Sequence, residues 1–246
     1  MSSPVKSALA LLSAAACAAT IAVAPAQAAP TKPHPTPFPI GVIATVYPSD
    51  VSSHGGIYYD IVDGFNDLRD HHPAVLKQNL QTVIDINQAA KNEPAVVNRA
   101  LADEHDDLLE TMSDALGTRV GAQFRAALTA GRLPKTEQLL AGTLARGGGV
   151  ASSTFPEKLV FNYPRPFVVA PNKITQFHRP GESGPYQNDP LSTSFPSGHT
   201  NQATWKAMLW ALMLPEFGQP LLARAQEVGY HRMVMGVHYP LDVIGG

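Results

Sequence analysis

Cysteine is almost absent from this 246-residue sequence, which contains only Cys17. A single cysteine cannot form an intramolecular disulfide, so hydrophobic packing has to stabilise the fold. Charged residues are also scarce, at 15%, and 18 Lys and Arg nearly balance 20 Asp and Glu, giving a net charge of -2. Because there is no basic surplus and aromatic residues make up only 7% of the chain, we expect no nucleic-acid partner. The hydrophobic content of 44% excludes a wholly disordered chain.

Long hydrophobic runs are missing beyond the first 28 residues. Lys6 precedes an alanine- and leucine-rich stretch that extends to Val23, and the small-x-small sequence Ala26-Gln27-Ala28 follows it. This order is typical of a secretory signal peptide. A transmembrane anchor is less favoured because the run is short and Pro25 follows it, and an acylated Cys17 is a minor alternative. We therefore predict a signal peptide at 1–28, no stable membrane insertion after its cleavage, and a secreted, periplasmic or cell-wall-associated product.

The rest of the chain divides into a leader and a helical region. Residues 29–40 carry proline at every second or third position, which predicts a stiff, extended leader. We expect residues 41–246 to form a single helical domain with an all-α fold, although 41–46 is either a short strand or an extended arm. The patterns predict helices at 58–68, 76–84, 94–112, 118–130, 135–144, 200–214 and 220–237. Glycine-rich segments at 146–149 and 181–194 are expected to be loops.

The clearest helical pattern lies in residues 94–112. Residues on one face recur at steps of four, four, three and four: Val97, Leu101, His105, Leu108 and Met112. The acidic residues of the same segment are expected on its wet side: Glu104, Asp106, Asp107 and Glu110. In the helix expected at 200–214, four large apolar residues are assigned to the core: Trp205, Met208, Trp210 and Leu212.

Three short blocks in the carboxy-terminal third carry chemically useful residues. They are Lys158 with Arg165-Pro166, then Pro196-Ser197-Gly198-His199, and finally Arg232 with His238 and Asp242. Taken one at a time, each block has an ordinary explanation as surface charge or a helix entry. Taken together, they combine three cations that suit phosphoryl oxygens with Ser197 and Gly198 at the start of a helix, where backbone N–H groups attract anions.

The spacing of His238 and Asp242 suggests a catalytic pair. Asp242 lies four residues after His238, so its carboxylate can accept the Nδ1–H and leave Nε2 as a nucleophile. His199 can then protonate the departing oxygen. If His199 starts protonated while His238 starts neutral, the rate peaks on the acidic side of neutrality. A zinc site at His231, His238 and Asp242 is disfavoured, because their spacing fits no standard site.

In this order, the blocks resemble the three-part signature of the phosphatidic acid phosphatase type 2 superfamily: Lys-x6-Arg-Pro, Pro-Ser-Gly-His and Ser-Arg-x5-His-x3-Asp. The group includes class A non-specific acid phosphatases, integral-membrane lipid phosphatases and vanadium haloperoxidases. The resemblance implies a compact helical bundle of the acid phosphatase/vanadium haloperoxidase type, with the site at helix ends. It also implies an exported phosphatase that acts on a phosphorylated small molecule or a lipid headgroup.

The resemblance assigns a role to each matching residue. It implies that the phosphate is held by five residues: Lys158, Arg165, Ser197, Gly198 and Arg232. It makes His238 the group that becomes phosphohistidine, Asp242 the residue that orients it, and His199 the acid for the leaving alcohol and then the base for water. No metal or other cofactor is implied, and vanadate is expected to bind as a phosphate mimic.

Two departures from the signature bear on these expectations. His231 stands where the motif has serine, which we interpret as a packing or supporting residue. The sequence ends at Gly246, four residues after Asp242, so we expect a chain truncated at its carboxy terminus. Two alternatives stay open: a vanadium haloperoxidase, because vanadate mimics phosphate, and a non-catalytic relative that only binds phosphate.

Overall fold

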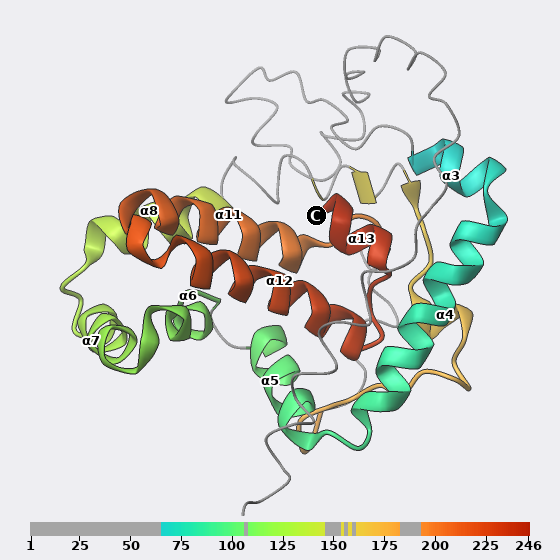
Figure 1. The fold of residues 1–246 in the computed structure, drawn as a ribbon, viewed down its shortest axis with the longest axis horizontal. Coiled ribbons are helices and arrows are strands. Elements are labelled where there is room, and N and C mark those ends of the chain that lie inside the picture. Colours follow the sequence, from blue (N-terminus) through green and yellow to red (C-terminus); the bar gives the residue numbers. More distant parts are fainter. Residues whose placement is uncertain (1–64, 106–107, 146–153, 155–156, 159–160, 183–192) are drawn as a thin grey trace, which may run out of the picture. The chain divides into compact units, whose positions relative to one another are not determined.

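The fold is seen in a computed structural model, which describes residues 65–105, 108–145, 154, 157–158, 161–182 and 193–246. In these ranges every regular element is a helix, so the predicted all-α class is confirmed (Figure 1). The helices are α3 (Phe65–His71), α4 (Pro73–Ala90), α5 (Pro94–His105), α6 (Leu108–Met112), η2 (Ser113–Leu116), α7 (Gly117–Thr129), α8 (Pro134–Ala145), α10 (Pro166–Val169), α11 (Gly198–Met213), η4 (Pro215–Phe217), α12 (Gly218–Val234) and α13 (Pro240–Gly245).

The predicted helices match the observed ones closely where both are described. The segments expected at 76–84, 118–130, 135–144 and 200–214 correspond to α4, α7, α8 and α11, with ends that move by a few residues. The helix expected at 94–112 is seen as α5 and α6, and residues 106–107 between them lie outside the described ranges. The predicted signal peptide, leader and extended arm, which together cover residues 1–46, also lie outside them.

The helix expected at 220–237 ends earlier, at Val234, because the chain turns at Gly236. Gly236 has φ +69°, a left-handed conformation that side chains other than glycine rarely adopt. Asn87 of α4 stabilises this turn: its Nδ2 donates to the carbonyls of Val234 and Thr175, at 2.8 and 2.9 Å. The turn thereby separates α12 from His238, which follows in an irregular segment.

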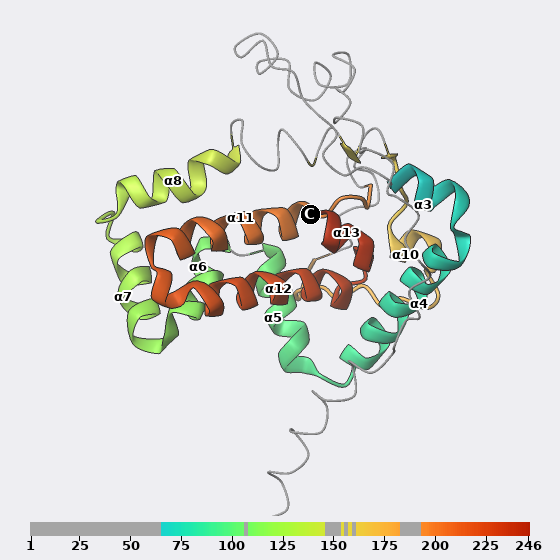
Figure 2. The ribbon, with the colours of Figure 1, turned by 45° about the horizontal axis from the view of Figure 1, so that its top comes forward.

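α11 and α12 form an antiparallel helical hairpin joined by η4, and they lie side by side in both views (Figures 1 and 2). Small buried residues on both helices, among them Ala203, Ala207 and Ala225, permit this close approach. Gly229 is also close to its neighbours, since a Cβ there would lie 2.7 Å from Cγ1 of Val243 in α13. Because the two helices run in opposite directions, the start of α11 and the end of α12 lie at the same end of the hairpin.

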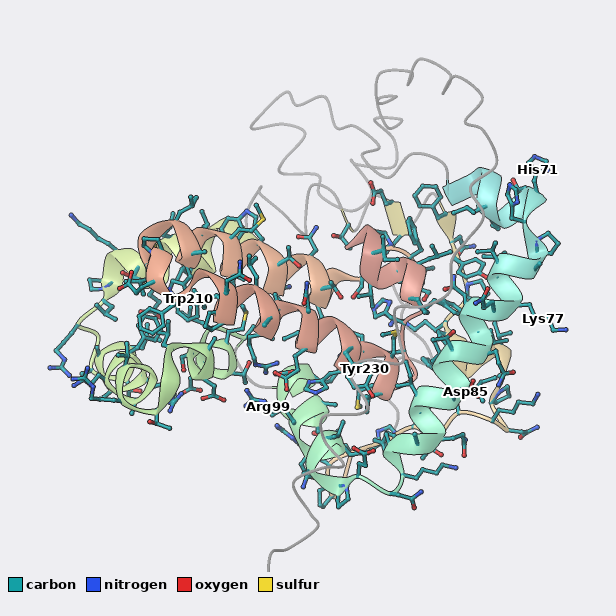
Figure 3. All side chains as sticks on the ribbon, in the orientation of Figure 1. His71, Lys77, Asp85, Arg99, Trp210 and Tyr230 are labelled. Atoms are coloured by element: carbon teal, nitrogen blue, oxygen red, sulfur yellow. The ribbon has the colours of Figure 1, made fainter. Side chains whose placement is uncertain are left out.

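Two large apolar clusters form most of the core of the described region, and a small third one contains Phe161 and Phe195. One joins α4, α5 and the end of α12 through Val83, Leu101 and Val234. The other joins α6, α11 and α12 through residues that include Met112 and Trp210. Trp210 is fully buried and packs edge-on against Phe124 of α7, with ring centroids 4.9 Å apart (Figure 3). Within the described ranges, the structure contains no helix with the length and apolar character of a membrane span.

Two sequence expectations about burial are wrong. Met208 and Leu212 are 57% and 80% exposed, so they lie on the outer side of α11 while Trp210 points inward. The two exposed positions are four residues apart, and helical geometry therefore places them on one face. Glu104 was expected in solvent, but its side chain is only 3% exposed because it is paired with Arg232 of α12.

Candidate active site

The hairpin end gathers the residues of the three sequence blocks. Ser197 and His199 lie at the start of α11, Arg232 lies near the end of α12, and Asp242 belongs to α13. Lys158 and Arg165 come from the segment that precedes and enters α10. The phosphate-binding and catalytic candidates all fall in the described ranges, and most of them are buried. Contacts between the blocks, described next, show that they meet at one site.

His238 lies between a carboxylate and a guanidinium group. Its Nδ1 is 3.1 Å from Oδ2 of Asp242, and its Nε2 is 3.3 Å from Nη1 of Arg165. Because arginine can only donate, Nε2 accepts this hydrogen bond and the ring proton sits on Nδ1, directed at Asp242. Burial, together with Arg165, Lys158, Arg232 and His199, lowers the pKa of His238 well below its ordinary value. His238 is therefore neutral near pH 7, with an Nε2 lone pair that can attack an electrophile.

Asp242 is held by the first turn of α13. Pro240 occupies the start of this helix, and the Asp242 carboxylate reaches back to accept the N–H of Tyr239 at 2.8 Å. The same oxygen, Oδ2, accepts a hydrogen bond from the Ser194 hydroxyl. Burial raises the pKa of Asp242 to about 6, although its bonds with Ser194 and Tyr239 lower it. Local helix capping thus fixes the carboxylate that orients His238.

Lys158 and Arg165 are anchored by backbone carbonyls. Nζ of Lys158 donates to the carbonyls of Thr193 and Ser194, at 2.8 and 3.0 Å. Nη1 of Arg165 donates to the carbonyl of Val237 at 2.9 Å, next to His238. Both cations are nearly buried, at 3% and 6% exposure. These bonds position the two positive charges beside the histidine.

Ser197 caps α11. Its hydroxyl oxygen accepts hydrogen bonds from the backbone N–H and the hydroxyl of Thr200, at 3.3 and 2.9 Å. Its own N–H donates to the carbonyl of Asp242 at 2.9 Å, which joins the second block to the third. Gly198 and His199 then open α11, whose first N–H groups have no intrahelical acceptor. This helix start faces the same end of the hairpin as Asp242, where it favours an anion.

Arg232 is 1% exposed and forms an ion pair with Glu104 of α5 through Nη1. Its Nε has no hydrogen-bond partner among the residues that the structure describes. Burial lowers the pKa of Arg232 to about 9, so the group stays cationic near pH 7. A buried cation with an unused donor is suited to an oxyanion.

His199 differs from the sequence expectation in its protonation. Its ring hydrogen-bonds to the backbone of Glu104, and burial lowers its pKa to about 4, helped by Arg165 and Lys158. In the unliganded protein His199 is therefore neutral at pH 6 to 7, contrary to the expectation that it starts protonated. A bound dianion would offset the nearby positive charges and raise this pKa.

His231, the departure from the motif, contacts a buried carboxylate of α5. Its Nδ1 lies 2.6 Å from Oδ2 of Asp103, and Arg224 also pairs with this buried carboxylate. These two partners hold the pKa of Asp103 below its ordinary value, although burial acts in the opposite direction. Asp103 and Glu104 are consecutive in α5, as His231 and Arg232 are in α12, so two adjacent pairs link the helices.

Sequence reasoning missed Ser194, Asp103 and Glu104. Ser194 lies two residues before the Pro-Ser-Gly-His block, and nothing in its own spacing marks it as a partner of Asp242. Asp103 and Glu104 lie far from the blocks in sequence, in a segment where acidic residues suggested a wet helix face. Among the described side chains, no three of the His, Cys, Asp and Glu type form a cluster that could hold a metal ion.

Comparisons with known proteins agree with these motifs. The sequence model of the PAP2 superfamily matches residues 138–246. A non-specific acid phosphatase of Salmonella typhi is 30% identical over 145 residues, which are 59% of this chain and 53% of that protein. One of Salmonella typhimurium is 29% identical over the same shares, and a lipid A 1-phosphatase of Rhizobium etli is 36% identical over 62 residues, or 25% and 27% of the two chains. The matched part thus spans about half the length of the acid phosphatases.

Proposed function

We propose that this protein hydrolyses phosphate monoesters through a phosphohistidine at His238, and the match of residues 138–246 to the PAP2 superfamily model supports the proposal. The observation that carries the proposal is the state of His238: neutral, buried, with Nδ1–H directed at Asp242 and Nε2 beside Arg165. A nucleophile held this way among three cations suits attack on a phosphoryl group.

The proposed reaction has two steps. Nε2 of His238 attacks phosphorus as the bond to the leaving oxygen breaks, and His199, which is protonated once the ester is bound, gives a proton to that oxygen. Asp242 stabilises the positive imidazole that forms. Water then attacks phosphorus, the N–P bond breaks, and His199 takes a proton from the water. The products are an alcohol and inorganic phosphate.

The chain's own residues would supply the charge stabilisation. Lys158, Arg165 and Arg232 are buried cations, and Ser197 lies at the positive start of α11. We propose that these groups hold the phosphoryl oxygens and that no metal is required, since the positive charge comes from side chains. Vanadate, which has the same shape and charge type, would bind there as an inhibitor.

The substrate class and location are inferred from the similar proteins and from the amino-terminal sequence. The similar proteins are called non-specific acid phosphatases and a lipid A 1-phosphatase, so we propose a phosphorylated small molecule or a lipid headgroup as substrate. The signal-peptide pattern at residues 1–28 supports export, with the site acting outside the cytoplasm.

The test is turnover of p-nitrophenyl phosphate with EDTA present, combined with rapid acid quench of labelled substrate. We expect activity in the chelator, labelled phosphohistidine in the wild-type protein, and loss of both in His238→Ala. His71→Ala, which removes an exposed histidine of α3 (Figure 3), is the matched control and is expected to retain full activity. Loss of activity in EDTA would contradict metal independence, and a label absent from wild-type protein during turnover would contradict the nucleophile.

A further inference from the structure

The second acidic residue of the α5 pair, Glu104, lies against the proposed phosphate site although the reaction above does not use it. Its side chain is 3% exposed and pairs with Nη1 of Arg232. The backbone of the same residue accepts a hydrogen bond from the ring of His199. Glu104 therefore contacts two residues of the proposed machinery, one through its carboxylate and one through its main chain.

We propose that Glu104 is a proton-linked positioning residue, which holds Arg232 before an anion binds and takes up a proton when a dianionic phosphoryl group binds. The inference deepens the proposed function and shares its anion site. It makes a claim of its own, which is that binding alone changes the number of protons on the protein.

The charges at the site lead to this conclusion. Lys158, Arg165 and Arg232 contribute three positive charges, and ionised Asp242 and Glu104 contribute two negative ones, while both histidines are neutral. A bound dianion would add two negative charges to a buried environment that already holds these two carboxylates. Negative charge there is costly unless it is paired or neutralised. A proton taken up at the site offsets part of this cost.

Glu104 is the group best placed to take that proton. An oxyanion that binds the unused Nε of Arg232 brings negative charge next to the Glu104 carboxylate and competes for the same guanidinium. Both effects favour the neutral acid. Burial, opposed by the attraction of Arg165 and helped by the repulsion of Glu182, raises the pKa of Glu104 to about 7. The charged and titratable groups that face it in the described ranges are Arg232, Arg165, His199 and Glu182, with Asp103 beside it in α5.

The experiment measures binding of sulfate, which stays a dianion from pH 5 to 8 and is not turned over. Calorimetric titrations in two buffers with different ionisation enthalpies give the number of protons taken up per sulfate. For the wild-type protein we expect close to none at pH 5.5 and an approach to one near pH 8. Above pH 7 the affinity should fall by up to about tenfold per pH unit, the slope for uptake of one proton.

Glu104→Gln keeps a hydrogen-bond acceptor for Arg232 but cannot titrate. We expect this variant to take up at least half a proton fewer than wild type at pH 8 and to bind sulfate more tightly there, with affinities that converge at pH 5.5. Glu110→Gln, which changes an exposed glutamate of α6, is the matched control and should behave as wild type. His199 is the other candidate for the group that takes up the proton. His199→Gln tests it, because this variant removes the histidine and leaves Glu104.

Each outcome decides the proposal. Unchanged uptake in Glu104→Gln, with uptake lost in His199→Gln, would assign the proton to the histidine and overturn the inference. Sulfate binding without proton uptake, or no sulfate binding in wild-type protein, would also overturn it. Should Glu104→Gln fail to fold, persistence of the wild-type uptake in both His199→Gln and Asp242→Asn would support the inference, and loss of the uptake in either variant would overturn it. If the wild-type protein bound sulfate with proton uptake but did not turn over p-nitrophenyl phosphate, the proposed function would be wrong and this inference would still hold.

Discussion

Ser194→Ala tests how the carboxylate beside the proposed nucleophile is kept ionised. The Ser194 hydroxyl donates to Oδ2 of Asp242, and both residues are fully buried. Burial raises the pKa of Asp242 to about 6, and the serine bond holds it below the value that burial alone would give. A hydrogen bond to a charged group contributes about 1.5–3 kcal/mol, which corresponds to a pKa change of about one to two units.

Removal of the hydroxyl should therefore raise the Asp242 pKa to about 7 or 8. Because His238 needs the ionised carboxylate, the ratio of variant to wild-type kcat is expected to fall as the pH falls through this range. We expect a loss of about fivefold to fiftyfold at pH 6 and one within about threefold at pH 8. The assay is kcat for p-nitrophenyl phosphate between pH 5 and 9, measured at saturating substrate.

Stability gives a second readout with a defined sign. When the folded-state pKa of a carboxyl is raised, the folded protein is less stable with the carboxyl ionised than with it protonated. Relative to wild type, Ser194→Ala should lose about 1.5–3 kcal/mol of unfolding free energy near pH 8 and much less near pH 5, where Asp242 is mostly protonated in both proteins.

Ser113→Ala is the matched control for this experiment. Ser113 is also fully buried, and its hydroxyl donates to the carbonyl of Glu110 at 2.6 Å and accepts from Arg125 at 2.7 Å, away from the hairpin end. It should lower stability at every pH and leave the rate profile unmoved. If Ser194→Ala lowered kcat by the same factor from pH 5 to 9, the serine would not act through the ionisation of Asp242, and this reasoning would be refuted.

Two further substitutions test how the fold positions the site. In Gly236→Ala, the residue has φ +69° and its new Cβ would overlap Ile174, whereas Gly131→Ala has a similar φ of +64° but open space. We therefore expect Gly236→Ala to lose more unfolding free energy than Gly131→Ala, and to have a lower kcat because the turn leads to His238. Equal thermal unfolding of the two variants would contradict this. His231→Ser, which restores the motif residue, leaves Asp103 with Arg224 as its remaining partner and should lower unfolding free energy by about 1–3 kcal/mol at pH 7. This effect fades as the pH falls below the ordinary carboxyl range and Asp103 protonates. Its kcat/KM should stay within about threefold of wild type, since Arg232 keeps its pair with Glu104, and a loss of a hundredfold or more would show that His231 supports catalysis directly.

The parts of this structure that the sequence predicted are those with local causes. Periodicity located α4, α7, α8 and α11, because a helix buries one face at a spacing that can be read along the chain. The contact between His238 and Asp242 was predictable because the residues are four apart and flank a proline that starts α13. Neither prediction depends on contacts that another helix makes.

The errors have non-local causes. The pattern of α5 places Glu104 away from its apolar face, but periodicity cannot tell whether the polar face meets water or a buried arginine from a helix more than 100 residues later. Met208 and Leu212 were assigned to the core because large apolar residues dominate α11, although only one of its faces has a partner in the described region. Packing between distant segments decides both cases.

The low pKa of His199 also changes the origin of an acidic rate optimum. With a pKa of about 4, His199 is a neutral imidazole at pH 6, so the free enzyme does not supply the acid. A phosphate monoester has a second pKa of about 6 and can bind as a monoanion that brings the missing proton. Proton transfer from the bound ester to His199 would then produce the acid required for the leaving oxygen, because the dianion left behind raises the histidine pKa. On this argument kcat/KM falls above pH 6 because the monoanionic substrate becomes scarce, whereas sulfate affinity falls only as Glu104 ionises.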